Sequence, residues 1–136
     1  MKITLQLQIP EKALWPNDRI NAFVKRQAIR RARHAAVYEA MRCLTDLGMT
    51  RGPKWERAKY YVTLYKTTAR FPDEDNLIAA LKPYLDGIQD AGIVRNDKGL
   101  RIAGTHFVRV PFAGTHFIFV PSMPRVEIDV WEDKQP

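Results

Sequence analysis

Cysteine is nearly absent from this 136-residue sequence, and long apolar runs are absent altogether. The single cysteine, Cys43, has no second cysteine with which to form an internal disulfide or a cysteine-based zinc site. No segment approaches the roughly 20 consecutive apolar residues that a membrane-spanning helix needs. The first ten residues alternate in polarity and form no continuous apolar stretch, so we expect no signal peptide and a cytoplasmic protein without membrane contact.

Acidic residues are scarce in the first half of the chain. Residues 1–70 hold 15 lysines or arginines against 5 aspartates or glutamates, whereas residues 71–136 hold 7 against 10. The formal net charge of +7 favours a polyanionic partner, and nucleic acid is the commonest polyanion. Six of the ten later carboxylates fall between Asp73 and Asp97, where the concentrated negative charge suits a bound cation.

The hydrophobic pattern predicts an α+β fold in one domain that spans residues 1–136. Strict alternation over residues 2–9 and a β-branched, aromatic stretch at 60–65 are typical of strands. Helical spacing extends over residues 19–47 and again from about 75 to 90, and the remainder to residue 130 has β character. That order predicts a mixed β-sheet with two main helices packed on one face.

Three details of the predicted helices can be tested by a structure. The first helix is expected to be capped by Asn17 or Asp18. Its core-facing residues are expected to be Ile20, Phe23, Val24, Ala28, Ala35, Tyr38, Met41 and Leu44. The second helix is expected to bury Leu77, Ile78, Leu81, Leu85 and Ile88. Pro83 lies inside the second helix and removes a backbone hydrogen bond, so a kink or a restart is expected there.

The segment Asp73-Glu74-Asp75-Asn76 places three carboxylates and an amide at the start of the second helix. Aspartates two positions apart can direct both carboxylates at one point, and oxygen ligands suit Mg²⁺. A cap or the helix dipole explains one or two acidic residues at a helix start, but not three. A metal site and a plain capped helix both stay open on spacing alone. Asp97 is a further candidate carboxylate, although Asn-Asp-Lys-Gly is also ordinary turn chemistry.

A run of cations without any acidic residue occupies the first helix between Arg19 and Tyr38. Its members are Arg19, Lys25, Arg26, Arg30, Arg31 and Arg33. Like charges one helical turn apart repel each other, and ordinary solvated helices mix the two signs. The run therefore favours contact with phosphates over a merely solvated face.

The acidic segment belongs to a longer series of short motifs. They are Pro72-Asp73-Glu74-Asp75-Asn76-Leu77, Lys82, Leu85-Asp86-Gly87-Ile88, Asp90-Ala91-Gly92-Ile93 and Asn96-Asp97, with Trp15-Pro16-Asn17-Asp18-Arg19 upstream. Together they resemble the RusA family of Holliday junction resolvases. The resemblance implies a RusA-like fold and a homodimeric endodeoxyribonuclease that uses Mg²⁺, or Mn²⁺ in its place. Such an enzyme nicks two strands of a four-way DNA junction symmetrically in recombination and repair, often in a prophage setting.

The resemblance also implies roles for individual residues. Asp73, Asp75 and Asp97 would be the catalytic, metal-binding carboxylates, and Asn17 would join the basic helix in binding DNA. The family's catalytic lysine falls at Ala79 here, which leaves Lys82 as the candidate helper, one turn further along and about 60° apart around the helix. Asn96 replaces the first residue of the family's usual Asp-Asp pair.

These departures keep a second hypothesis open, a catalytically weak or inactive RusA-like protein that acts as a branched-DNA-binding module. Phosphatases of the haloacid-dehalogenase type and nucleotide-sugar transferases also use Asp-x-Asp. They fit less well, because both usually need longer chains.

Overall fold

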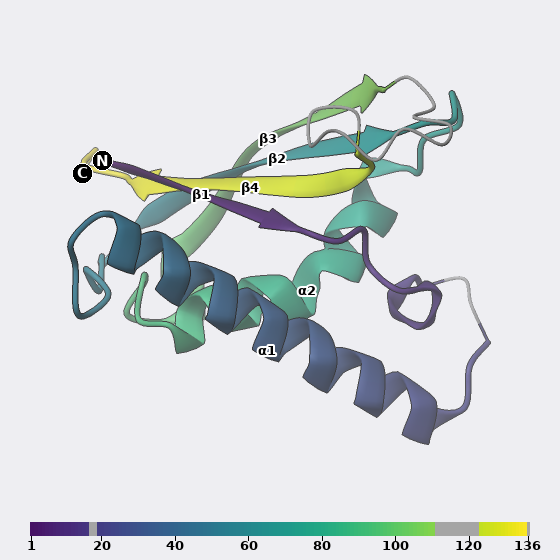
Figure 1. The fold of residues 1–136 in the computed structure, drawn as a ribbon, viewed down its shortest axis with the longest axis horizontal. Helices are drawn as coiled ribbons and strands as arrows, with labels where there is room; N and C mark the ends of the chain where they lie inside the picture. Colours follow the sequence, from purple (N-terminus) through teal and green to yellow (C-terminus); the bar gives the residue numbers. More distant parts are fainter. Residues whose placement is uncertain (17–18, 111–122, 136) are drawn as a thin grey trace.

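A computed structural model of the chain describes residues 1–16, 19–110 and 123–135 (Figure 1). Its elements, in chain order, are β1 (Lys2–Leu7), the 3₁₀ helix η1 (Lys12–Leu14), α1 (Ala22–Asp46), β2 (Ala58–Lys66), α2 (Glu74–Asp90), the 3₁₀ helix η2 (Asp97–Gly99), β3 (Leu100–Arg109) and β4 (Arg125–Glu132). The predicted α+β fold, with a mixed sheet and two main helices, is confirmed. Within the described residues, no helix combines the length and the apolarity needed to cross a membrane.

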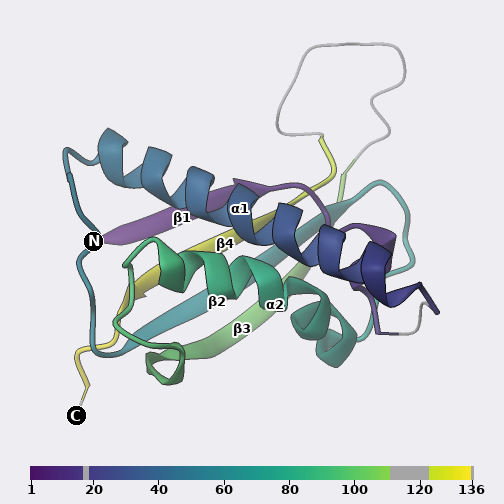
Figure 2. The same ribbon diagram turned by 90° about the horizontal axis from the view of Figure 1, so that it is seen from below.

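The described strands form one mixed sheet in the order β1-β4-β2-β3. β4 runs antiparallel to both β1 and β2, whereas β2 and β3 are parallel. Parallel neighbours need a long crossover connection, which α2 supplies between β2 and β3. Figures 1 and 2 show α1 and α2 side by side beneath one face of the sheet.

The core lies between this sheet face and the two helices. Alternate residues of each inner strand are buried, and in β4 these are Val126, Ile128 and Val130, as the alternation predicts. The second helix follows its prediction closely. Leu77, Leu81 and Ile88 are fully buried, and the other two expected core residues, Ile78 and Leu85, pack against the core from partly buried positions.

The expected core face of α1 is only partly correct: Ala28 and Leu44 are buried and Ile20 packs against the core, but the rest of the buried face differs. Its buried residues are Ala28, Ala32, Ala36, Ala40, Cys43 and Leu44. Several residues expected in the core are instead exposed, namely Phe23, Val24, Ala35, Tyr38 and Met41. The prediction was wrong because it weighted large apolar side chains, whereas this interface selects small ones: a Cβ built on Gly87 of α2 would lie 2.6 Å from Ala36 Cβ. Alanine at every fourth position therefore allows a close crossing of the two helices.

The ends and the interior of the helices also refine the sequence predictions. α1 is capped by Asn21, whose side chain accepts a hydrogen bond of 2.7 Å from the Phe23 N–H. The prediction that Asn17 or Asp18 caps this helix was wrong, because the helix begins at Ala22 and not near Arg19. Asn17 and Asp18 themselves lie outside the described residues, as does the part of the predicted β region at 111–122. α2 continues through Pro83 to Asp90, so the helix does not restart there, and it changes direction along its length (Figure 2).

Candidate functional site

The predicted acidic cluster lies at the start of α2, just beyond the end of β2. Asp73 is the residue that caps α2, with an extended backbone (φ −63°, ψ 148°), yet its side chain makes no capping hydrogen bond. Asp73, Glu74 and Asp75 are all exposed, and none of them joins an ion pair among the described residues. The positive end of the α2 dipole stabilises part of this charge. The remaining charge is available to an external cation.

Asp97 lies at the other end of α2. It opens η2, directly before β3, and Leu100 of β3 pairs with Ala58 at the beginning of β2. Asp73 instead follows the end of β2, and the 17 residues of α2 separate the two ends (Figure 2). At a rise of about 1.5 Å per residue, a straight helix of this length spans roughly 25 Å. One chain therefore does not bring the three predicted metal ligands together. Accordingly, no group of three His, Cys, Asp or Glu residues within the described parts of the chain could hold a metal ion.

Lys82 is also separated from the acidic cluster. It lies seven residues after Asp75, about 10 Å further along the axis of α2. Its Nζ donates a hydrogen bond of 2.7 Å to Asp86 Oδ1, one helical turn further from the cluster. The structure therefore does not place Lys82 beside Asp75. Ala79, the position at which the RusA resemblance implies a lysine, carries no charge.

Two of the predicted DNA-binding arginines have structural partners. Arg31 makes a bidentate contact with Glu11, through Nε at 3.0 Å and Nη2 at 2.7 Å. Arg33 Nη2 donates to Asp90 Oδ1 at 2.9 Å. These hydrogen bonds lower the pKa of Glu11 and of Asp90 below their ordinary values. Both arginines thus help to join α1 to its neighbours, a role that the sequence pattern did not reveal.

The other predicted phosphate-binding residues remain exposed on or beside the first half of α1. They are Arg19, Lys25, Arg26 and Arg30, and no ion pair among residues 1–16, 19–110 and 123–135 includes them. Asn17 lies outside the described residues. Figures 1 and 2 show α1 and α2 running in the same general direction, so these cations extend toward the end of the molecule where α2 begins.

A groove of about 590 Å³, which the sequence pattern does not reveal, lies next to the acidic cluster. Its described lining residues are Pro10, Lys12, Trp15, Lys66, Thr68, Arg70, Phe71 and Pro72, and we name it the Trp15 groove. Pro72 directly precedes Asp73, so the groove adjoins the carboxylates. Two segments far apart in the sequence build it, which is why no local motif predicts it.

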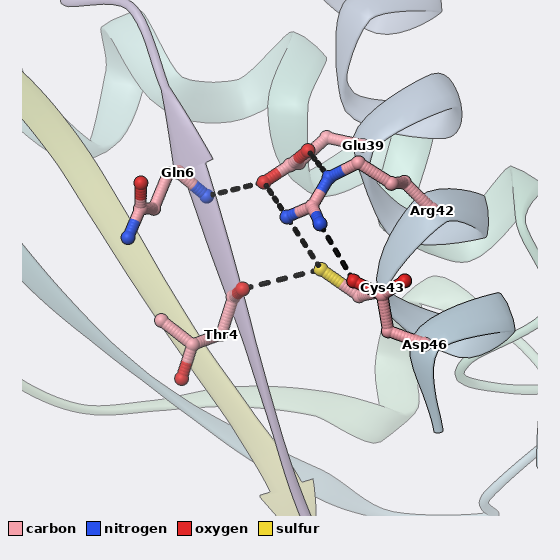
Figure 3. A network of polar contacts seen from close by, with 6 residues as sticks. All are labelled: Thr4, Gln6, Glu39, Arg42, Cys43 and Asp46. Carbon is pink, nitrogen blue, oxygen red and sulfur yellow. Dashed lines mark hydrogen bonds and ion pairs between the residues drawn. The ribbon is translucent and has the colours of Figure 1, made fainter. Parts of the chain in front are cut away.

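A second polar cluster joins α1 to the edge strand β1 (Figure 3). Glu39 accepts a hydrogen bond of 2.9 Å from the Gln6 N–H and one of 2.7 Å from Arg42 Nε. The Cys43 thiol donates to the Thr4 carbonyl oxygen at 3.2 Å, and burial raises the pKa of this thiol. The contacts of Glu39 with Gln6 and of Cys43 with Thr4 hold α1 against β1, and the hydrogen bond from Arg42 fixes the Glu39 carboxylate within α1. We therefore interpret it as structural and assign no chemistry to Cys43.

Replacing Glu39 with glutamine is expected to lower the free energy of unfolding by about 1 kcal/mol at neutral pH, because a charge-assisted hydrogen bond is lost. Burial raises the pKa of Glu39, but the hydrogen bonds from Arg42 and the Gln6 backbone outweigh it and leave the pKa below its ordinary value of 4.5. A depressed folded-state pKa stabilises the protein above the unfolded-state pKa, and this stability is lost on acidification. The difference between wild type and Glu39→Gln should therefore shrink as the pH falls below about 4.5.

Urea titrations across this pH range measure the effect. Glu56→Gln is the matched control, since Glu56 pairs with Arg95 on the surface and both side chains are more than half exposed. Its replacement should change stability by less than about 0.5 kcal/mol. An equal decrease in the free energy of unfolding in both variants would show that Glu39 does not hold α1 against β1.

Comparisons with known proteins add little about function. No protein-family model matches the sequence. A protein of Xylella fastidiosa (strain Temecula1 / ATCC 700964), described as an uncharacterized protein, is 36% identical to this chain over 89 residues. The alignment covers 65% of this chain and 56% of the relative, so the chain spans little more than half the length of the relative that it matches. The name of that relative gives no activity.

Proposed function

We propose that this protein is a Mg²⁺-dependent endodeoxyribonuclease of the RusA type that resolves four-way DNA junctions by paired, symmetric nicks. The observation that carries the proposal is the start of α2, where the carboxylates of Asp73 and Asp75 are exposed and engaged neither in capping nor in an ion pair among the described residues. The adjoining groove and the first half of α1 supply cations. The motif resemblance to the RusA family supports the same conclusion.

The chemistry divides between the acidic and the basic residues. Asp73 and Asp75 supply hard oxygen ligands of the kind that Mg²⁺ or Mn²⁺ prefers. A divalent ion held there would lower the pKa of attacking water and offset the negative charge that grows on the phosphate. Lys25, Arg26 and Arg30 would hold DNA phosphates, each adding to affinity independently of base sequence.

The position of Asp97 makes a second copy of the chain part of the proposal. Because Asp73 precedes α2 and Asp97 follows its far end, the proposal places Asp97 in the metal site of a partner subunit. A two-fold dimer that brings η2 of one copy to the start of α2 in the other would complete two equivalent sites. Two such sites are also what two symmetric nicks require.

The direct test is incubation of the purified protein with labelled four-way junction, duplex and single-stranded DNA, with and without Mg²⁺. We expect paired nicks in the junction that depend on Mg²⁺. Binding of the junction without cleavage of any branched DNA would contradict the enzymatic proposal and favour a branched-DNA-binding module. Ala79, Asn96 and the position of Lys82 are the features that favour this second candidate.

Mixing two inactive variants tests the composite site. Neither Asp75→Asn nor Asp97→Asn should cut the junction alone, whereas a co-refolded mixture should regain nicking. In the mixed dimer one site carries both substitutions and the other carries none, so one intact site remains. The expected product is junction nicked in a single strand.

The matched control is a co-refolded mixture of Asp73→Asn and Asp75→Asn. Both substitutions lie in the same element, so each site of this mixed dimer loses one carboxylate and no recovery is expected. Failure of the first mixture to recover, while wild type refolded in the same way is active, would show that Asp97 does not act across the dimer.

A further inference from the structure

The two aromatic side chains of the Trp15 groove are held in place by other parts of the protein. Trp15 Nε1 donates a hydrogen bond of 3.0 Å to the Pro10 carbonyl oxygen. The Phe71 ring stacks on Phe107 of β3, with ring centroids 5.2 Å apart and planes inclined by 30°. A side chain that is already fixed loses little freedom when a ligand packs on it. The groove therefore presents flat apolar surfaces that are organised before any ligand arrives.

The charge of the groove has one sign. Lys12, Lys66 and Arg70 line it, and its described lining contains no acidic residue. None of the three forms an ion pair within the described parts of the chain. Lys66 Nζ donates to the Arg70 carbonyl oxygen at 3.3 Å, a neutral acceptor, so among the described residues no carboxylate offsets its positive charge. The groove thus combines aromatic walls with three cations.

A nucleotide carries the complementary features, namely a planar base and an anionic phosphate. Stacking on aromatic side chains beside cations that track the backbone is how proteins bind single-stranded nucleic acid. The volume of about 590 Å³ lies within the range of about 300–1,000 Å³ found for small-ligand sites. In a duplex both faces of a base are covered by its neighbours, so only an unstacked base can offer a face to the groove.

We propose that the Trp15 groove binds one unpaired nucleotide of the DNA substrate, with its base against Trp15 and Phe71 and its phosphates against the three cations. The inference rests on the proposed function and specifies how its substrate is recognised. Since Pro72 is followed directly by Asp73, a strand held in the groove has its next phosphate beside the carboxylates assigned to the metal. The groove would thereby select a strand at the point where base pairing is broken.

Fluorescence without metal tests binding in the groove apart from cleavage. Short oligodeoxythymidylate, a blunt hairpin duplex and inorganic phosphate are titrated into the full-length protein in EDTA. The chain has three tryptophans, and only Trp15 lines the groove among its described residues. We expect oligodeoxythymidylate to quench the emission of the wild type and to leave that of Trp15→Phe nearly unchanged. Equal quenching by the duplex or by phosphate alone would overturn the proposal.

Replacing Arg70 with alanine tests the cations without disturbing the fold, because this side chain is exposed. We expect the Kd for oligodeoxythymidylate to rise about five-fold or more and the Kd for the duplex to change much less. Lys25→Ala is the matched control, since it removes one exposed cation from α1 and should weaken both ligands alike. An equal effect of Arg70→Ala on single-stranded and duplex DNA would also overturn the proposal.

The outcomes separate this inference from the proposed function. If the protein binds single-stranded DNA in the Trp15 groove but cuts no branched DNA, the result would support nucleotide binding in the groove and contradict the nuclease proposal. If the protein cuts the junction but its Trp15 emission does not change when single-stranded DNA is added, the result would support the nuclease proposal and contradict nucleotide binding in the Trp15 groove.

Discussion

Replacing Asp75 with asparagine is expected to abolish junction cleavage while leaving junction binding intact. The substitution keeps the size of the side chain and its position in the first turn of α2 but removes the charge that would hold a divalent ion. Metal stabilisation of the reacting phosphate contributes several kcal/mol, so we expect the cleavage rate to fall by about a hundredfold or more. Single-turnover cleavage and electrophoretic binding of the same labelled junction measure the two properties separately.

Glu74→Gln is the control for this prediction. Glu74 is the neighbouring carboxylate, is equally exposed and carries the same charge, but the proposal assigns it no ligand role. Its replacement should leave cleavage within a few-fold of wild type. Two results would contradict the prediction: a loss of junction binding in Asp75→Asn, or an equal loss of activity in both variants. Either would show that Asp75 acts only through the negative charge it adds to the start of α2, and does not bind a metal.

Gly87→Val should be among the most destabilising single substitutions in this chain. A Cβ at this position would lie 2.6 Å from the Arg33 carbonyl oxygen as well as from Ala36 Cβ. The carbonyl belongs to the α1 backbone and cannot rotate away, so the two helices would have to separate. Overpacking of this kind costs about 1–3 kcal/mol and occasionally more. Urea denaturation should therefore show a clear decrease in the midpoint.

Ala79→Val is the matched control, because it adds a similar side chain to an exposed position of the same helix. It carries only the modest helix-propensity cost of valine, well below about 1 kcal/mol. Similar midpoints for the two variants would show that the crossing of α1 and α2 is looser than the structure indicates.

Sequence periodicity was sufficient for β1, β4 and α2. Alternation placed the buried residues of β4 correctly, and spacing of three to four residues identified the core face of α2, because large aliphatic side chains dominate both. In α1 the same reasoning was correct for Ala28 and Leu44, but it placed exposed residues such as Phe23 in the core. The interface of α1 is made largely of alanines, and these contribute little to a hydrophobic pattern. The need for small side chains follows from the close approach of Gly87 on α2, which the sequence of α1 does not encode.

The candidate site was predictable in its parts but not in its assembly. Asp73 and Asp75 share one helix start, so their proximity follows from local sequence. Whether Asp97 joins them depends on the length and direction of α2, which carries Asp97 away from the other two. The Trp15 groove depends on residues 10–15 meeting residues 66–72, and no local pattern encodes that meeting.

The contacts between α1 and β1 have a consequence for how the molecule behaves among other copies of itself. β1 is an outer strand of the sheet, and unpaired backbone groups on such strands can recruit foreign strands and start aggregation. Here the Gln6 N–H donates a hydrogen bond to Glu39 of α1, and the Thr4 carbonyl oxygen accepts one from Cys43 of α1. These contacts hinder another strand from pairing with this edge of the sheet, so two copies of the chain are less prone to associate through β1.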